Sequence, residues 1–426
     1  MNSLYFKDSD YLKKEQWKLL LKQLKYARQY SPFYGKTFQK EGIEVDSIRT
    51  YQDFKKIPIT TKEDLQLYNE DFISVPKDEI IDHVTTSGTL GKPVSFALNE
   101  TDLQRLAENE YQSFVMAGIT KSSTVQITTT LDRRFMAGMA YFLGLRKLGA
   151  GVIRVGSGNP QLQWESINRF KPQYLVAVPS FLLKLIDYAR ENNIDYSASS
   201  VKAAICIGEP LRNKDLNLNV LGSKIEQLWD IELFSTYAST EMSTAFTECS
   251  YHNGNHVLSD LIYTEILDTQ RKPVNPGEVG ELVVTPLGTQ TMPLLRYATG
   301  DMLTYFDSPC NCGRNTFRLS PVLGRMKQMI KFKGTSVYPQ AVIDILNGIN
   351  NLPSFVIEVF KNETEMDELQ ILVPDTITTE TINKIKKFLQ SGLQVTPHIA
   401  KRKLTEIEAL KFSNTSRKPQ IFRDLR

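Results

Sequence analysis

The chain has 426 residues, more than the roughly 100–200 of a typical single domain, so two or more lobes are expected. Its composition, with 41% hydrophobic and 23% charged residues, excludes a disordered or fibrous chain. The 51 Lys and Arg residues nearly balance the 48 Asp and Glu residues, and the resulting net charge of +3 argues against a dedicated nucleic-acid or membrane-surface binder.

No membrane or targeting segment is expected. The first residues contain no apolar core of the kind that a signal peptide needs. The longest apolar stretch, near Met136–Leu145, has ten residues, whereas a bilayer span needs about 20. We therefore expect a soluble protein. Within it, the first 75 residues have the spacing of helices, including a periodic run over Tyr11–Tyr30 and a start signal at Thr60 or Thr61.

From residue 80 to about 240, short apolar strands alternate with helices, a pattern that predicts a mostly parallel α/β sheet. The expected strands are Ile80–Val84, Val94–Leu98, Val125–Thr129, Gly151–Val155, Tyr174–Val178, Val201–Ile207 and Glu232–Tyr237. The expected helices are one that opens at the capping-box spacing of Thr101–Gln104, then Met136–Leu148, Gln161–Phe170 and Pro179–Asn192.

Beyond residue 256 the helical patterns give way to short β-rich runs, which predict a small β-subdomain. These runs are His256–Ile262, Glu281–Thr285 and Met302–Phe306. A compact α+β pattern follows. We therefore expect a large N-terminal domain over residues 1–326, with its β-subdomain at about 250–326, and a small C-terminal domain over residues 327–426.

The loop Thr85–Pro93 is the first segment with a chemical signature. It holds two glycines, four hydroxyl side chains and one lysine, a set that can present N–H groups and a cation to a polyphosphate. It is not a Walker P-loop, because only two residues separate its glycines and a proline follows its lysine. On this pattern alone, a plain β-hairpin turn is an equal alternative.

Two further turns lie where ligands bind in open α/β sheets, beyond the carboxyl ends of strands, and a third turn holds an acidic residue after a glycine. Gly208-Glu209-Pro210 and Tyr237–Glu241 each follow an expected strand, and they offer an aromatic ring for a base and a carboxylate for Mg²⁺. Asp301, after Gly300, can accept hydrogen bonds from ribose hydroxyls. Taken singly, each is better explained as an ordinary turn.

Together and in this order, these segments resemble the adenylate-forming superfamily, and within it the phenylacetate–CoA ligase family. The similarity extends over nearly the whole chain. The segments that carry it are Pro32-Phe33-Tyr34, Ile57–Lys62, Thr86–Pro93, Val178-Pro179-Ser180, Gly208-Glu209-Pro210, Tyr237–Glu241, Gly277–Thr285, Pro293–Asp301, Cys312-Gly313-Arg314, Gly324-Arg325 and Lys411–Arg426. The resemblance implies the adenylate-forming fold and a homodimer.

The resemblance also implies a reaction in two halves. A carboxylate attacks the α-phosphate of ATP, with Mg²⁺ present, to give an acyl-adenylate and pyrophosphate, and the thiol of coenzyme A then displaces AMP. Both partners of the first step are anions, so catalysis depends on positioning and charge stabilisation. The need for ATP, with no signal peptide, predicts a cytoplasmic location. The alternatives left open are a carrier-protein or hydroxyl acceptor, and a non-catalytic nucleotide-binding homologue.

The site roles follow from the resemblance. The residues expected at the β- and γ-phosphates are Thr86, Ser87, Gly88, Thr89, Gly91 and Lys92. Those expected around adenine are Gly208, Glu209, Pro210 and Tyr237, with Asp301 and Arg325 at the ribose. Those expected to act on the reacting groups are Glu241 through Mg²⁺, Thr240 near the α-phosphate, and Lys418, which domain closure would bring in about the hinge residue Lys327.

Some positions depart from the family pattern. Leu90 replaces a hydroxyl in the phosphate loop, and Ala238 replaces a glycine after the tyrosine. The run Asp132–Met139 lacks the usual aromatic, glycine-rich character. The expected acyl-pocket residues are Phe135, Ala137, Gly138 and Ala238. Because these changes touch acyl recognition, an aromatic or other medium-sized carboxylic acid is expected rather than phenylacetate itself.

Three cysteines and one histidine form a second constellation. Cys249, His256, Cys310 and Cys312 make a complete Cys₃His set for structural Zn²⁺, with both halves in the expected β-subdomain. The spacing is not that of a standard zinc finger, so unligated, reduced cysteines in surface loops remain an alternative, as does His252 in place of His256.

Overall fold

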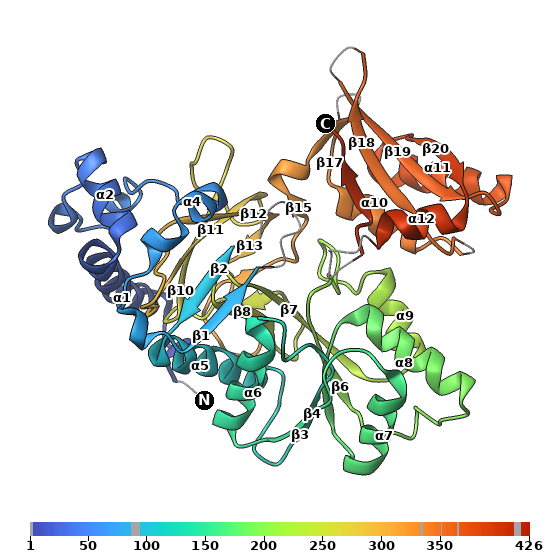
Figure 1. Ribbon diagram of the computed structural model, residues 1–426, viewed down its shortest axis with the longest axis horizontal. Coiled ribbons are helices and arrows are strands. Elements are labelled where there is room, and N and C mark those ends of the chain that lie inside the picture. Colours follow the sequence, from blue (N-terminus) through green and yellow to red (C-terminus); the bar gives the residue numbers. More distant parts are fainter. Residues whose placement is uncertain (1–2, 87–93, 333–334, 351, 364–365, 413–418) are drawn as a thin grey trace.

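The computed structural model describes residues 3–86, 94–332, 335–350, 352–363, 366–412 and 419–426 (Figure 1). A large N-terminal body is built on two sheets, and a smaller body follows beyond residue 330. The expected α/β class is confirmed. Among the described helices, none is both long and apolar enough to span a bilayer.

A nine-stranded mixed sheet, in the order β13-β14-β9-β8-β7-β6-β5-β3-β4, is the largest layer. The strands from β4 to β7 pair in parallel, as their apolar sequences predict, and the remaining pairings are antiparallel. The bounds are β3 (Thr124–Ile127), β4 (Gly151–Arg154), β5 (Tyr174–Ala177), β6 (Ala203–Cys206), β7 (Glu232–Ser239), β8 (Thr244–Glu248), β9 (Asn255–His256), β13 (Tyr305–Phe306) and β14 (Arg318–Leu319).

Helices flank the parallel half because each parallel connection needs a crossover (Figure 1). They are α5 (Glu100–Met116), α6 (Met136–Leu148), α7 (Pro160–Phe170), α8 (Pro179–Glu191) and α9 (Val220–Leu228). The expected start of α5 at Thr101 is wrong. Asn99 caps this helix in a reciprocal capping box with Asp102. An asparagine side chain accepts a hydrogen bond from the N–H groups of the first turn as readily as a threonine side chain does.

A four-stranded antiparallel sheet packs with the N-terminal helices around the main core. Its strands are β10 (Ile262–Leu267), β11 (Gly280–Pro286), β12 (Tyr297–Leu303) and β15 (Gly324–Arg325), and the hairpin β1 (Asp82–Thr85) and β2 (Ser95–Leu98) lies nearby. The helices are α1 (Ser9–Tyr30), α2 (Pro32–Glu41), α3 (Tyr51–Phe54) and α4 (Lys62–Leu67), with 3₁₀ turns η1 (Ser3–Phe6), η2 (Val45–Ser47), η3 (Asn69–Phe72) and η4 (Lys77–Glu79).

The expected strand His256–Ile262 is also wrong. Only Asn255–His256 pairs in the nine-stranded sheet, and the next strand begins at Ile262 in the other sheet. The chain must turn between the two sheets, and it does so with a hydrogen bond from the Leu261 N–H to the Leu258 carbonyl at 2.9 Å.

The C-terminal body has its own hydrophobic cluster, formed by residues between 330 and 422. It follows the 3₁₀ turn η5 (Met326–Gln328) and lies apart from most of the N-terminal body (Figure 1). Its strands are β16 (Ile330–Phe332), β17 (Thr335–Val337), β18 (Val356–Lys361), β19 (Asp367–Pro374), β20 (His398–Arg402) and β21 (Phe422–Asp424), and its helices are α10 (Pro339–Asn347), α11 (Thr379–Leu393) and α12 (Leu404–Lys411).

Candidate functional site

Three of the expected nucleotide residues meet where the two sheets of the N-terminal body approach each other. The phenol of Tyr237, on β7, donates a hydrogen bond to Asp301 Oδ2 at 2.7 Å. Arg325 Nε, on β15, donates to Asp301 Oδ1 at 3.1 Å. Asp301 and Arg325 are register partners on neighbouring strands, so the backbone fixes their approach. The structure therefore brings these three residues together.

The electrostatics keep Tyr237 a hydrogen-bond donor. Removal from water raises the pKa of its phenol well above the usual value, and the carboxylate of Asp301 raises it further. The ring of Tyr237 stacks on Phe246 with centroids 5.8 Å apart and an angle of 23° between the planes. A flat, partly exposed ring and a nearby carboxylate are what recognition of a nucleoside requires.

Glu241 lies in the turn between β7 and β8. The turn is closed by a hydrogen bond from the Ser243 N–H to the Thr240 carbonyl at 3.1 Å. Among the described residues, Glu241 makes no hydrogen bond or ion pair, and its side chain is partly exposed. Burial raises the pKa of Tyr297, and the charge of Glu241 raises it next, so this carboxylate lies near Tyr297 at the start of β12. A partly exposed carboxylate without a protein cation fits a divalent metal.

The expected adenine turn is held by its neighbours. The carboxylate of Glu209 accepts hydrogen bonds from the Ser180 N–H at 2.9 Å and from the Ser180 hydroxyl at 2.8 Å, at the N-terminus of α8. Asn219 donates to the Pro210 carbonyl at 2.8 Å. Gly208 has a φ of +76°, which only glycine adopts without strain. Glu209 thus positions this turn rather than offering a free carboxylate.

Of the expected phosphate loop, the structure describes only its base. Thr86 and Val94 exchange hydrogen bonds, at 2.9 Å between backbone groups and 3.0 Å to the Thr86 hydroxyl, so the two ends of the loop are held together. The other expected phosphate ligands and the expected adenylation lysine lie outside the described residues. They are Ser87, Gly88, Thr89, Gly91, Lys92 and Lys418.

The expected acyl-pocket residues lie at the start of α6 and on β7. Phe135 and Ala137 are partly buried there, while Ala238 is exposed beside Tyr237. Gly138 is buried, and a Cβ on it would lie 2.1 Å from the Thr130 carbonyl oxygen. This position therefore requires glycine, because α6 approaches the backbone of Thr130 and Leu131, in the segment after β3, too closely for a side chain.

Lys327, the expected hinge residue, lies in η5, between β15 of the N-terminal body and β16 of the C-terminal body. Its ammonium group contacts the carboxylate of Glu63, on α4 of the N-terminal body. On the other side of the junction, Arg426 donates to the carbonyls of Met329 at 3.0 Å and Lys327 at 3.2 Å. The junction is thus tied to both bodies.

The cysteines and histidine of the expected metal set also meet. The four potential ligand atoms of Cys249, His256, Cys310 and Cys312 all lie within 4.8 Å of one another. The Cys249 and Cys310 sulfurs are 3.7 Å apart, and the Cys312 sulfur is 3.5 Å from His256 Nε2. A tetrahedral zinc with bonds of about 2.0–2.3 Å requires ligand separations of about 3.5–3.8 Å. These two separations match this requirement.

The protonation states of His256 and Cys312 favour metal binding, whereas that of Cys249 opposes it, because a metal binds the thiolate and the neutral imidazole. Burial lowers the pKa of His256, which keeps the imidazole neutral, and the Thr316 hydroxyl lies 3.1 Å from its Nδ1. Burial raises the pKa of Cys249 to about 12. Burial also acts to raise the pKa of Cys312, but hydrogen bonds, first that with His256, lower it to about 5. Cys249 and Cys310 are buried, which contradicts the surface-loop interpretation of these cysteines.

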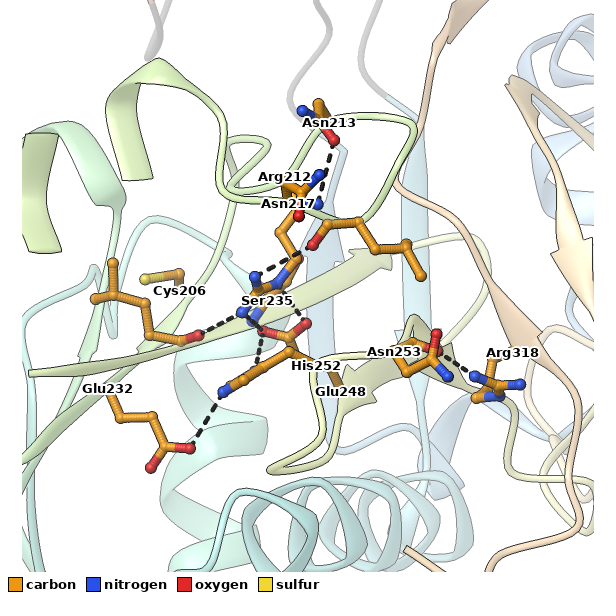
Figure 2. Close-up of polar contacts among 12 residues, drawn as sticks. Cys206, Arg212, Asn213, Asn217, Glu232, Ser235, Glu248, His252, Asn253 and Arg318 are labelled. Carbon is orange, nitrogen blue, oxygen red and sulfur yellow. Dashed lines mark hydrogen bonds and ion pairs between the residues drawn. The ribbon is translucent and has the colours of Figure 1, made fainter. Parts of the chain in front are cut away.

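His252 is not part of this set. Its two ring nitrogens lie 3.2 Å from Glu232 and 3.1 Å from Glu248 (Figure 2). The same Glu248 accepts two hydrogen bonds from the guanidinium of Arg212, at 2.7 and 3.1 Å, and one from the Ser235 N–H at 2.6 Å. Sequence reasoning missed this buried pair, which ties the segment after the adenine turn to β7 and β8.

Residues 32–293 match the sequence pattern of the family described as AMP-binding enzyme. The phenylacetate-coenzyme A ligase of Thermus thermophilus is 28% identical over 353 residues, which are 82% of this chain and 78% of that protein.

Solved structures show the same fold. A 2-hydroxyisobutyryl-CoA ligase in the postadenylation state, in complex with R3-HIB-AMP, has a TM-score of 0.85 and 22% identity, and the match covers 100% of this chain and 92% of that chain. The same ligase, in complex with 2-HIB-AMP and CoA in the thioesterification state, has a TM-score of 0.72 and 23% identity, covering 99% and 91%.

Proposed function

Because this chain belongs to the family of AMP-binding enzymes, we propose that it is an ATP-dependent carboxylate–CoA ligase. It activates an aromatic or medium-sized carboxylic acid as the acyl-adenylate and transfers the acyl group to the thiol of coenzyme A. The observation that carries the proposal is the meeting of Tyr237, Asp301 and Arg325 beside the turn of Glu241. The similarity to phenylacetate-coenzyme A ligases over most of the chain supports it.

In this proposal the nucleotide lies between the ends of β7 and β12. Tyr237 and the turn Gly208–Pro210 face the adenine, and Asp301 accepts hydrogen bonds from the ribose hydroxyls. The two donors already on Asp301 hold its carboxylate in one orientation, so the ribose meets a preorganised acceptor. Arg325 carries positive charge to the same place.

Glu241 fits the role of a Mg²⁺ ligand, since it is partly exposed and lacks a protein cation among the described residues. Mg²⁺, when bound, would neutralise phosphate charge and so favour attack by an anionic carboxylate. Thr240 precedes it in the turn and would contact the α-phosphate. Lys418 would add a cation at the leaving or attacking oxygen, which electrostatic stabilisation of two anions requires.

Residues 1–326 and 327–426 are proposed to act as a large and a small domain that rotate about Lys327. The contact between Lys327 and Glu63 joins the two bodies in the present arrangement, and a rotation must break it. One solved ligase of this fold has been observed in postadenylation and thioesterification states, and this supports two working arrangements.

The direct test is carboxylate-dependent exchange of pyrophosphate into ATP, across a panel of aryl, arylalkanoic and fatty acids. Glu241→Ala and Lys418→Ala are expected to abolish exchange supported by one class of acid. CoA is then supplied to the competent acid, and thioester formation is measured by mass spectrometry. Exchange without a CoA thioester would favour a carrier-protein or hydroxyl acceptor. ATP binding without any exchange would favour a non-catalytic homologue.

We propose a structural Zn²⁺ at Cys249, His256, Cys310 and Cys312, supported by the ligand separations. Four protein ligands leave no open position, so the ion would stabilise β9, β14 and the adjoining loops and would take no part in the reaction. The test is metal content: about one zinc per chain is expected in the wild type and a loss in Cys312→Ser. A metal-free protein with four titratable thiols would overturn the proposal.

We also propose a cytoplasmic homodimer. The cytoplasmic location rests on the need for ATP and coenzyme A, and the dimer rests on the family resemblance alone. Light scattering on the purified protein tests the dimer directly: a mass near 97 kDa, twice the 48.5 kDa of the chain, is expected, and a monomer mass at working concentration would refute it.

A further inference from the structure

Arg105 is a buried arginine behind the turn of Glu241. It lies on α5 with 7% of its surface exposed. Among the described residues it forms no ion pair within 4 Å, and burial lowers the pKa of its guanidinium to about 10, against the opposing effect of Asp102 and Asp260. A buried charge without a paired carboxylate is costly, so it persists only where its hydrogen bonds are complete.

The hydrogen bonds of Arg105 go to three separate segments of backbone. Nε donates to the Leu287 carbonyl at 2.5 Å, and Nη1 donates to the carbonyl of Ser243. Nη2 donates to the Thr244 hydroxyl at 2.8 Å and to the carbonyl of Leu261. One planar side chain thus fixes the end of β11, the start of β10 and the turn that leads into β8.

The turn that Arg105 contacts is one that needs support. Ser243 has a φ of +45°, in the left-handed region that non-glycine residues seldom adopt. Its N–H closes the turn on the Thr240 carbonyl at 3.1 Å, while its own carbonyl faces Arg105. The conformation that places Glu241 therefore depends on Ser243, and the position of Ser243 depends on Arg105.

We propose that Arg105 is a positioning residue for the metal- and phosphate-binding turn, acting through the Ser243 carbonyl. This inference rests on the proposed role of Glu241. Arg105 does not touch substrate; it sets where the Glu241 carboxylate meets Mg²⁺. A displacement of about 1 Å at a reacting centre can lower the rate by about 100-fold. Loss of the support from Arg105 should therefore appear first as weaker binding of Mg²⁺ with ATP.

Asn109, on the same face of α5, provides a matched control. It is buried, with 1% of its surface exposed, and it exchanges hydrogen bonds with the backbone of Ala245 at 2.8 and 3.1 Å. It therefore anchors the same strand, two residues beyond Ser243, without contacting the turn. A variant of Asn109 should therefore show how Mg²⁺ dependence changes when the contact between α5 and β8 is weakened. A variant of Arg105 should show this change together with the effect of displacing the turn.

The experiment compares Arg105→Lys and Arg105→Met with Asn109→Ala in pyrophosphate exchange at varied Mg²⁺. Arg105→Met should raise the Mg²⁺ concentration for half-maximal exchange by about 10-fold or more, and Arg105→Lys by less, because lysine keeps the charge but not the three-way contact. Asn109→Ala should leave it within about 2-fold of the wild type. Equal shifts in all variants, or an unchanged value in folded Arg105→Lys, would overturn the inference.

A second measurement needs no turnover. Mn²⁺ binding in the presence of α,β-methylene-ATP is followed by electron paramagnetic resonance, in the wild type, Arg105→Lys and Asn109→Ala. Weaker Mn²⁺ binding only in Arg105→Lys supports the inference, even if the wild type exchanges no pyrophosphate and the proposed function fails. Equal Mn²⁺ binding in all three proteins refutes it, whatever the exchange assay shows.

Discussion

The Tyr237 phenol donates to the Asp301 carboxylate across the boundary between two sheets, because β7 belongs to the nine-stranded sheet and β12 to the four-stranded one. The distance is 2.7 Å, and Asp301 has 6% of its surface exposed. Arg325 holds the other carboxylate oxygen. The proposed ribose acceptor is thus fixed from both sheets, and any relative movement of the sheets would change its orientation.

Tyr237→Phe is expected to weaken ATP binding while the fold is retained. The lost hydrogen bond lies within the protein, so its effect on ATP is indirect: the Asp301 carboxylate is then held by Arg325 alone and is less well oriented for the ribose. KM for ATP in pyrophosphate exchange should therefore rise by about 10-fold, with a smaller change in kcat. Tyr305→Phe is the control, since the Tyr305 hydroxyl donates at 3.4 Å to the Val274 carbonyl, away from this site. Equal KM values for the two variants would remove Tyr237 from the nucleotide site.

Much of this arrangement can be predicted from the sequence because it depends on strand ends. Tyr237 and Glu241 follow an apolar strand, and parallel strands present their ends to one edge of the sheet. The zinc set is harder to predict, because His256 reaches Cys312 only through the pairing of β9 with β14, in which Arg318 opposes His256. Sequence spacing carries no signal for such a pairing.

The need for a glycine in α9 and the role of Arg105 could not be predicted from the sequence. The first depends on close packing between segments, and the second on hydrogen bonds to backbone atoms. Helix α9 contains Gly222, although glycine lowers helix propensity. Glycine is needed at this position for a steric reason: a Cβ there would lie 2.9 Å from the Leu211 carbonyl oxygen. Arg105 donates to backbone carbonyls, which every residue carries, so the sequence does not indicate which residues are its partners. The available signal was polar residues at helical spacing, Asp102, Arg105 and Asn109, which together form a buried polar face on α5.

Glu248→Gln is expected to destabilise the protein strongly. It leaves the Arg212 guanidinium buried without a carboxylate, and breaking such a pair from one side costs about 3–5 kcal/mol. The free energy of unfolding in urea measures this loss. Glu380→Gln is the control, because Glu380 and its partner Lys384 are both exposed and an ion pair in water contributes little to stability. A loss below about 1 kcal/mol in Glu248→Gln would show that the buried pair tolerates a neutral partner.

Gly138→Ala is expected to displace the start of α6. The added methyl group would meet the Thr130 carbonyl oxygen at 2.1 Å, and overpacking of this kind costs about 1–3 kcal/mol. Gly35→Ala, on α2, is the matched substitution: its nearest atom would lie 3.9 Å away, so higher helix propensity should stabilise by up to about 1 kcal/mol. Opposite signs in thermal unfolding are therefore expected, and destabilisation by both substitutions would contradict the steric argument.

Glu110 is expected to make stability fall as the pH rises. It is 5% exposed between α5 and α6, and burial raises the pKa of its carboxyl from 4.5 to about 8. Between these two values the folded chain holds a proton that the unfolded chain has released. The free energy of unfolding should therefore decrease with pH, by at most about 1.4 kcal/mol per unit from this group. Below pH 4.5 both states are protonated, and above about 8 the loss is complete.

Glu110→Gln removes this titration while nearly preserving the shape of the side chain. The variant should match the wild type near pH 4 and become progressively more stable than it from about pH 5 to about pH 8, after which the difference stays constant. Urea unfolding of both proteins across this range measures the difference directly. A difference that does not change with pH would show that the Glu110 carboxyl ionises in the folded chain as it does in the unfolded one, and hence that burial does not control its protonation.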